Sequence, residues 1–505
     1  MSAQPLFRSY RGIILALLSL TVYVWVSERA NLGFGIVCMV NSSALVSDFA
    51  PNSSIPQQCK ARLDSVDDIP TNMGYHGELT WTKSEQANLF SALFYGSLLT
   101  VGFSGTIADS FDPKMLILVA ITFYTILTLV TPLLVENYVV YLIARFLMGL
   151  ADGLIFPATS SMVARWFPQD ERSTVSAIYT SGNQLANSFN VLLAGKLCSL
   201  DFLNGWPLIF IIWGAFGLIY ILFFLLFASN SPNENRFISE KEKVYLNIQL
   251  STQHNGLATR KLSSAKSIPW IAMLTSPATI AVVLSQFSFN YINSFWQTFL
   301  PSYFRDVLLL DLSKNGLFSA APFFFQLICK LFMGFGSDAL KRKGIMSETT
   351  SCKILQSLAT FGTALCFVLL ALFVDCTNPM LGFILFGIMG CVFAGQIAGA
   401  FTASLAIAPS YTGTITSLSS FVGGLANVAV PTTIGLFNKH GTREEWNVIF
   451  YIAAGVSFFT GLFFLIFGTA EIQEWARVSK PQVVSIQSIS LPNLKQEDDH
   501  QKSNV

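Results

Sequence analysis

The sequence predicts an all-α polytopic membrane protein, with twelve transmembrane helices arranged in two six-helix bundles. Three observations support this fold class. Of the 505 residues, 52% are hydrophobic and only 12% are charged, whereas about 25% of residues are charged in a soluble domain. Twelve apolar segments each reach the roughly 20 residues that a helix needs to cross a bilayer. The two halves of the chain also repeat one short motif at corresponding positions.

The first apolar segment follows Arg8 and Arg11 and extends to Val40, with Glu28 and Arg29 in its middle. Apolar character resumes after these charges and no small-residue cleavage pattern follows, so we expect one long helix and not a cleaved signal peptide. Glu28 points about 100° away from Arg29 on such a helix. It therefore pairs elsewhere or faces an aqueous vestibule.

A polar loop at 41–82 contains two glycosylation sequons, which begin at Asn41 and Asn52. Two sequons in one long loop indicate that it faces the lumen or the outside. Asn41 lies close to the membrane, so Asn52 is the better expected acceptor. The eight cysteines show no metal-binding spacing. Three of them lie at or outside the non-cytoplasmic ends of the spans and could form one disulfide among themselves: Cys59, Cys198 and Cys376.

An even number of spans places both termini on the same side of the membrane. Placing them in the cytoplasm puts most Lys and Arg residues on that side, as the positive-inside rule requires. The later spans are predicted at roughly 87–107, 115–135, 138–162, 173–195, 206–229, 277–300, 315–337, 354–374, 381–407, 413–437 and 448–469. The predicted organisation is a cytoplasmic N-terminus (1–11), an N-terminal bundle (12–230), a cytoplasmic central loop (231–268), a C-terminal bundle (269–470) and a cytoplasmic tail (471–505).

The central loop contains the capping-box sequence Ser239-Glu-Lys-Glu242, which predicts the start of a short amphipathic helix that continues through Tyr245. We expect its charged side chains to form a solvated face and not a docking site.

The fourth span contains two opposite charges, Arg145 and Asp152. A charge at the bilayer centre costs about 2.5 to 3.5 kcal/mol on insertion scales, so it normally faces a partner, a cavity or a ligand. A spacing of seven residues puts both side chains on nearly one helix face, so both are suited to line one cavity. The alternative is that other helices neutralise both charges, which then only hold the bundle together. In the eighth span, Lys330 is expected to extend its ammonium group to the cytoplasmic interface.

The repeated motif is Gly105-Thr-Ile-Ala-Asp109 after the second span and Gly334-Phe-Gly-Ser-Asp338 after the eighth. Two copies at corresponding cytoplasmic mouths predict paired gating motifs. This duplication resembles the major facilitator architecture, in which two related bundles rock about a central site.

Several longer motifs occur in order along residues 10–477. They are Arg29-Ala-Asn31-Leu32, Arg145-x-x-x-Gly149-x-x-Asp152-Gly153-x-x-Phe156-Pro157, Trp166-Phe-Pro168-x-x-Glu171-Arg172-Ser173, Pro269-Trp270-x-x-x-Leu274-Thr275-Ser276, Ala408-Pro409-Ser410-Tyr411-x-Gly413 and Glu445-Trp446-x-x-x-Phe450-Tyr451. With these motifs the chain resembles the anion-cation symporter family. That family includes the type I sodium-phosphate cotransporters, the lysosomal sialic acid transporter and the vesicular glutamate transporters.

The resemblance implies secondary active transport of phosphate, a sialate-like molecule or another carboxylate by alternating access. It implies that Arg29 and Arg145 bind the anion and that Asp152 takes part in coupling to sodium or protons, with Glu28 as the second candidate for coupling. Phe90 stands where the vesicular glutamate transporters have a His, and Phe289 where they have an Arg, so vesicular glutamate transport is disfavoured. The alternative is a transporter-like anion sensor or subunit without net transport.

Polar residues on spans five, seven and ten are expected either to contact the rest of the substrate or to hydrogen-bond between helices. They are Asn183, Asn290, Asn293, Gln297 and Gln396.

Composition also argues against other functional classes. The net charge is +1 and the Lys and Arg residues lie in short loops, so nucleic-acid binding is not expected. The chain contains no recognisable nucleophile-base set or metal cluster, so we expect no enzymatic activity and no cofactor apart from the coupling ion. The expected partners are a small anionic substrate and the lipid membrane. We expect a functional monomer in the plasma membrane or in a lysosomal or vesicular membrane.

Overall fold

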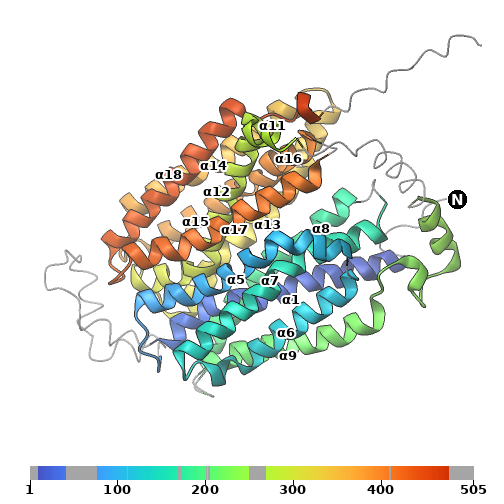
Figure 1. Ribbon diagram of the computed structural model, residues 1–505. Coiled ribbons are helices and arrows are strands. Elements are labelled where there is room, and N and C mark those ends of the chain that lie inside the picture. Colours follow the sequence, from blue (N-terminus) through green and yellow to red (C-terminus); the bar gives the residue numbers. More distant parts are fainter. Residues whose placement is uncertain are drawn as a thin grey trace, which may run out of the picture.

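The computed structural model describes residues 9–40, 77–110, 112–168, 172–200, 202, 205–249, 269–408 and 411–476. The long helices form two groups that lie side by side (Figure 1). The first group contains α1 (Tyr10–Met39), α5 (Lys83–Ser110), α6 (Pro113–Leu134), α7 (Tyr138–Trp166), α8 (Arg172–Leu197) and α9 (Trp206–Phe227). The second contains α12 (Pro277–Asp306), α13 (Leu312–Arg342), α14 (Glu348–Phe373), α15 (Pro379–Phe393), α17 (Thr412–Phe437) and α18 (Arg443–Phe467). Short helix α11 (Trp270–Thr275) precedes α12, while a π-helical turn η4 (Ile397–Phe401) and α16 (Thr402–Ala406) continue α15.

Within the described part of the chain, ten helices are long and apolar enough to cross a membrane. The two remaining long helices, α8 and α12, carry several Ser, Asn and Gln residues. Both lie at the interface between the two groups, where α8 packs against α13 and α12 packs against α1. Helices that border a solvated pathway do not need to be apolar on every face. The predicted fold class of twelve helices in two bundles is therefore confirmed.

We name the two ends of the bundle by the chain segments that they carry. The terminal face is where α1 begins and α18 ends, and the loop face is the opposite end, where α1 ends. Close helix contacts join the two groups toward the loop face. A Cβ atom at Gly33 in α1 would overlap the backbone oxygen of Gln297 in α12, and one at Gly195 in α8 would lie 3.2 Å from the Cα of Gly316 in α13. Glycine is therefore required at position 33, while the contact at position 195 leaves little room for a larger residue.

Three charged residues, Lys83, Arg305 and Asp306, form what we call the loop-face ion cluster. Lys83 Nζ lies 2.6 Å from Asp306 Oδ2, and Arg305 Nε lies 2.9 Å from Asp306 Oδ1. All three side chains are at most 9% exposed. Arg305 Nη1 also donates to the carbonyl oxygen of Val37 at 3.4 Å. The cluster thus joins α5 and α1 of the first bundle to α12 of the second.

At the terminal face, the packing around three glycines is open. A Cβ atom added at Gly102 in α5, or at Gly334 or Gly336 in α13, would meet no atom within 4 Å. The close backbone approaches at Gly33 and Gly195 and the loop-face ion cluster, in contrast, join the two bundles toward the loop face. The predicted gating motifs lie at this open end, because residues 105–109 are in the last turns of α5 and residues 334–338 are in α13. Their gating role remains a prediction, and both sequons lie outside the described residues.

The central loop forms a helix at residues 240–249, as the capping sequence predicts. Ser239 Oγ accepts a hydrogen bond from the Glu242 backbone N–H at 3.3 Å. The expectation of a solvated charged face is wrong for Glu242, which is only 4% exposed. Its carboxylate accepts hydrogen bonds from the backbone N–H groups of Tyr10 and Arg11, at 3.0 and 3.1 Å, and from Arg11 Nε at 3.3 Å. The first N–H groups of α1 lack helical partners, so a carboxylate stabilises this end.

We expect Glu242→Gln to destabilise the protein, because the neutral amide loses charge-assisted hydrogen bonds worth about 1.5 to 3 kcal/mol each at most. Thermal unfolding of the purified protein in detergent would measure the change. Glu240→Gln is the matched control, because Glu240 lies on the same helix and is exposed. Equal melting temperatures for the two variants would contradict a docking role for Glu242.

Cys38 at the end of α1 and Cys198 at the end of α8 form a disulfide, with their Cα atoms 6.1 Å apart. The sequence leaves open a bridge from Cys198 to Cys59 or Cys376, so the partner of Cys198 is corrected. Cys376 is also disulfide-bonded, and Cys59 lies outside the described residues. Sequence reasoning misses Cys38 because this residue lies inside an apolar segment.

Candidate substrate pocket between the two bundles

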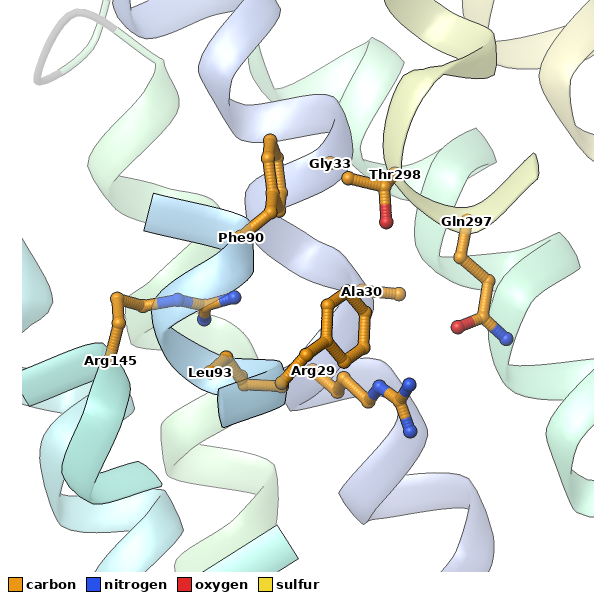
Figure 2. Close-up of a pocket in the computed structure, with 9 residues that line it drawn as sticks. Arg29, Ala30, Gly33, Phe90, Leu93, Arg145, Gln297 and Thr298 are labelled. Carbon is orange, nitrogen blue, oxygen red and sulfur yellow. The ribbon is translucent and has the colours of Figure 1, made fainter. Parts of the chain in front are cut away.

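A pocket lies between the two bundles, where α1, α5 and α7 of the first bundle meet α12 of the second. Its lining comprises Arg29, Ala30, Gly33, Phe90, Leu93, Phe94, Arg145, Gln297 and Thr298. In Figure 2, Arg145 and Gln297 lie on opposite sides of the pocket and Arg29 lies between them. The structure therefore brings together the two arginines that the sequence predicts to bind an anion.

Arg145 is only 2% exposed. Its Nε atom has no hydrogen-bond acceptor among the described residues. A guanidinium group presents a planar set of donors that matches a carboxylate or a phosphate. A buried positive charge with an unused donor is therefore available for an anion that enters the pocket.

Asp152 lies beside the pocket and pairs with Arg29. Its Oδ1 atom is 3.7 Å from Arg29 Nη1 and accepts a hydrogen bond from Trp25 Nε1 at 2.7 Å. Its Oδ2 atom accepts from Ser97 Oγ at 2.8 Å. The sequence predicts that Arg145 and Asp152 can line one cavity, and the structure places Asp152 next to that cavity through its contact with Arg29. An anion that binds Arg29 would compete with Asp152 for the same guanidinium group.

Arg29 also lies against two aromatic rings. Its Cζ atom is 5.1 Å from the ring centroid of Phe94 and 5.8 Å from that of Trp25. Cation–π contacts of this kind favour a positive charge in a place that is poor in water. Sequence reasoning missed Trp25 and Ser97 as partners of Asp152. One signal was available for Trp25, which lies four residues before Arg29 and so on the same helix face.

Glu28 is completely buried. Its Oε1 atom accepts a hydrogen bond from Thr125 Oγ1 at 2.8 Å, while Oε2 has no partner within the described ranges. Of the two placements left open by the sequence, the vestibule is wrong, and the partner of Glu28 is the Thr125 hydroxyl group. No Lys or Arg nitrogen of the described residues lies within ion-pair distance of it.

The polar candidates on α8, on α12 and directly before η4 occupy different places. Gln297 lines the pocket, and its Nε2 atom donates to Asn183 Oδ1 on α8 at 3.4 Å. Asn290 donates to a carbonyl oxygen of its own helix at 2.9 Å, and Asn293 is half-buried on α12. Gln396 accepts from Gln356 Nε2 at 3.3 Å inside the second bundle. The pocket lining thus includes only Gln297 of this set, with Asn183 in contact with it.

Two further sequence expectations concern Phe90 and Lys330. Phe90 lines the pocket and packs against Phe299, with ring centroids 5.1 Å apart. The departure from the vesicular glutamate transporters therefore falls at the pocket itself. The expected extension of Lys330 to the interface is wrong, because this side chain is only 8% exposed and Nζ donates to Thr180 Oγ1 on α8 at 3.2 Å.

The sequence profile of the family described as Major Facilitator Superfamily matches residues 69–431. The chain belongs to this superfamily. It is 33% identical to "Uncharacterized transporter slc-17.3" of Caenorhabditis elegans, over 95% of this chain and 92% of that protein. It is 29% identical to human "Sialin", over 94% of this chain and 92% of that protein. A solved structure, "Crystal structure of D-xylose-proton symporter", has the same fold, with a TM-score of 0.63 and 16% identity over 92% of this chain and 100% of that chain.

These similarities support the resemblance to the anion-cation symporter family and the assignment as a transporter. This major facilitator protein is a multi-pass membrane transporter and not an enzyme, as the sequence predicts.

Proposed function

We propose that this transporter moves a small anion across its membrane by alternating access, coupled to protons or sodium ions. The observation that carries the proposal is the pocket between the bundles, which the buried Arg145 and the partly buried Arg29 line from different helices. Arg145 supplies a guanidinium group with an unused donor. Arg29 supplies a second guanidinium group, which is paired with Asp152. An anion bound by both would offset the cost of keeping their charges at membrane depth.

Coupling is proposed to act through Asp152 and Glu28. When Asp152 binds a proton or a sodium ion, its attraction for Arg29 falls, so Arg29 becomes free to bind the anion. The anion and the coupling cation would therefore bind together. Glu28 is suited to carry a proton, because a charge on this buried carboxyl group would have no cationic partner within the described residues.

The proposed substrate is phosphate, a sialate or a related carboxylate. The relation to sialin supports a carboxylate, and Phe90 at the pocket disfavours a glutamate-type site. We place both termini in the cytoplasm, so the closed loop face would point to the lumen or the outside. The proposed functional unit is the monomer.

Uptake into proteoliposomes tests the proposal. Radiolabelled phosphate, sialate, glutamate and urate would be offered under imposed sodium, proton and voltage gradients. We expect uptake of phosphate or sialate that depends on one cation gradient and is lost in Arg145→Ala. A voltage dependence would report net charge movement, which is worth about 2.3 kcal/mol per charge per 100 mV.

Folded protein that binds one of these anions without moving it would overturn the transport proposal and favour an anion sensor. Uptake that is equal in the wild type and in Arg145→Ala would overturn the assignment of the pocket.

A further inference from the structure

The Lys330 ammonium group crosses the interface between the bundles. Lys330 belongs to α13 in the second bundle, and its hydrogen-bond acceptor Thr180 belongs to α8 in the first. An ammonium group has three donors, and among the described residues Thr180 Oγ1 is the one acceptor that lies within hydrogen-bond distance of them. Lys330 is therefore a buried cation with unused donors.

No carboxylate oxygen of the described residues lies within 4.0 Å of Lys330 Nζ. The nearby pocket cannot supply one, because Arg29, Trp25 and Ser97 already hold Asp152. A buried charge within a membrane normally has a counter-charge. The counter-charge for Lys330 is therefore expected to come from a ligand.

Two buried amides that each have an atom without a hydrogen-bond partner among the described residues lie close to Lys330 along the same interface. Gln326 lies one turn before Lys330 on the same face of α13, is 1% exposed, and has no partner for either amide atom among the described residues. Gln184 lies one turn after Thr180 on α8, is 4% exposed, and its Oε1 atom is likewise unpaired there. Helices α8 and α13 run antiparallel. From the Thr180–Lys330 contact to the Gly195–Gly316 contact, residue numbers rise along α8 and fall along α13. This register places Gln184 opposite Gln326.

The two amides and Lys330 lie on the terminal side of the pocket. At a rise of about 1.5 Å per residue, Lys330 lies roughly 18 Å from the terminal end of α13, whereas Arg145 lies roughly 31 Å from the terminal end of α7. Asn183 connects the two places, since it lies about one turn from Thr180 and accepts a hydrogen bond from the pocket residue Gln297. An anion that leaves the arginines toward the terminal face would therefore reach Lys330 next.

We propose that Lys330 and the Gln326 amide form a second anion subsite, which binds the carboxylate or phosphate group of the substrate between the pocket and the terminal face. Together they offer an ammonium group and an amide N–H to one oxyanion. The subsite rests on the proposed function, because it binds the same substrate at a second position on the same pathway. A positive charge there lowers the energy of an anion that would otherwise cross a neutral constriction.

Equilibrium binding to the purified full-length protein tests the subsite. The probes are radiolabelled phosphate and N-acetylneuraminate, and the variants are Arg145→Ala, Lys330→Met and the double variant. We expect Arg145→Ala to retain binding at the second subsite. Removing Lys330 as well, in the double variant, should lower this remaining affinity at least about tenfold. Lys330→Arg keeps the charge and should retain binding. Lys314→Met is the matched control, because Lys314 lies on the same helix and its side chain is 67% exposed.

Binding that does not change when Lys330 is removed would overturn the subsite, as would the absence of binding to folded Arg145→Ala. Displacement by chloride, without displacement by either oxyanion, would overturn the assignment of its ligand. Separate uptake measurements distinguish the two proposals. Transport without Lys330-dependent binding would support the proposed function and overturn the subsite. Lys330-dependent binding without transport would support the subsite and overturn the proposed function.

Discussion

Asp306→Ala is expected to open the loop face. The substitution leaves Lys83 and Arg305 buried as like charges, without the carboxylate that pairs with both of them. Breaking a buried ion pair by removing one partner costs about 3 to 5 kcal/mol. Lys83 and Asp306 belong to different bundles, so the cost falls on the state in which the bundles touch at the loop face. A difference of this size would change the ratio of the two states by more than about a hundredfold.

Thiol accessibility from the loop face measures this change. Phe90→Cys places a thiol in the pocket lining, and a membrane-impermeant thiol reagent is then added from the loop face. We expect its labelling rate to rise by about tenfold or more in the Asp306→Ala background. Asp311→Asn is the matched control, because it removes an exposed ion pair with Lys314. Equal labelling in both backgrounds would show that the loop-face ion cluster does not hold the bundles closed.

Arg145→Ala is expected to weaken anion binding at the central pocket strongly. Truncating one partner of a buried, hydrogen-bonded charge pair costs about 2 to 5 kcal/mol, so affinity at this pocket should fall by a hundredfold or thereabouts. Arg145→Lys should recover some of the affinity, because it keeps the charge but loses the planar pair of donors. The Arg29 pair with Asp152 should persist in both variants.

Initial uptake rates over a range of substrate concentrations check this prediction. Arg236→Ala is the control, since Arg236 is an exposed residue of the central loop. Comparable loss in Arg236→Ala and Arg145→Ala would point to a general charge effect. An unchanged substrate affinity in Arg145→Ala would place the anion elsewhere.

The sequence alone was sufficient for the helices and for the two arginines of the pocket. Arg29 and Arg145 stand out because each interrupts an apolar span. The loop-face ion cluster could not be predicted in this way. Lys83 and Asp306 lie at helix ends, where charges are ordinary, and their partnership joins segments 223 positions apart in the chain.

Tertiary contacts also determine the side-chain environments that the sequence predicts wrongly. Glu242 fits a local helix-capping pattern, which is equally compatible with a solvated carboxylate and with one docked on α1. Lys330 fits the pattern of a lysine that reaches the interface, and only the position of α8 shows an acceptor inside the protein. Such choices depend on which helix lies opposite, and no local pattern contains that information.

The Cys38–Cys198 disulfide has a mechanical consequence for alternating access. It ties the loop-face ends of α1 and α8, the two helices that touch the second bundle through Gly33 and Gly195. These two helix ends cannot separate from each other, so they must move together as one rigid unit. The interface between α1 and α12 and the interface between α8 and α13 would then open in a single concerted step. Reducing the disulfide would allow the two interfaces to open one after the other.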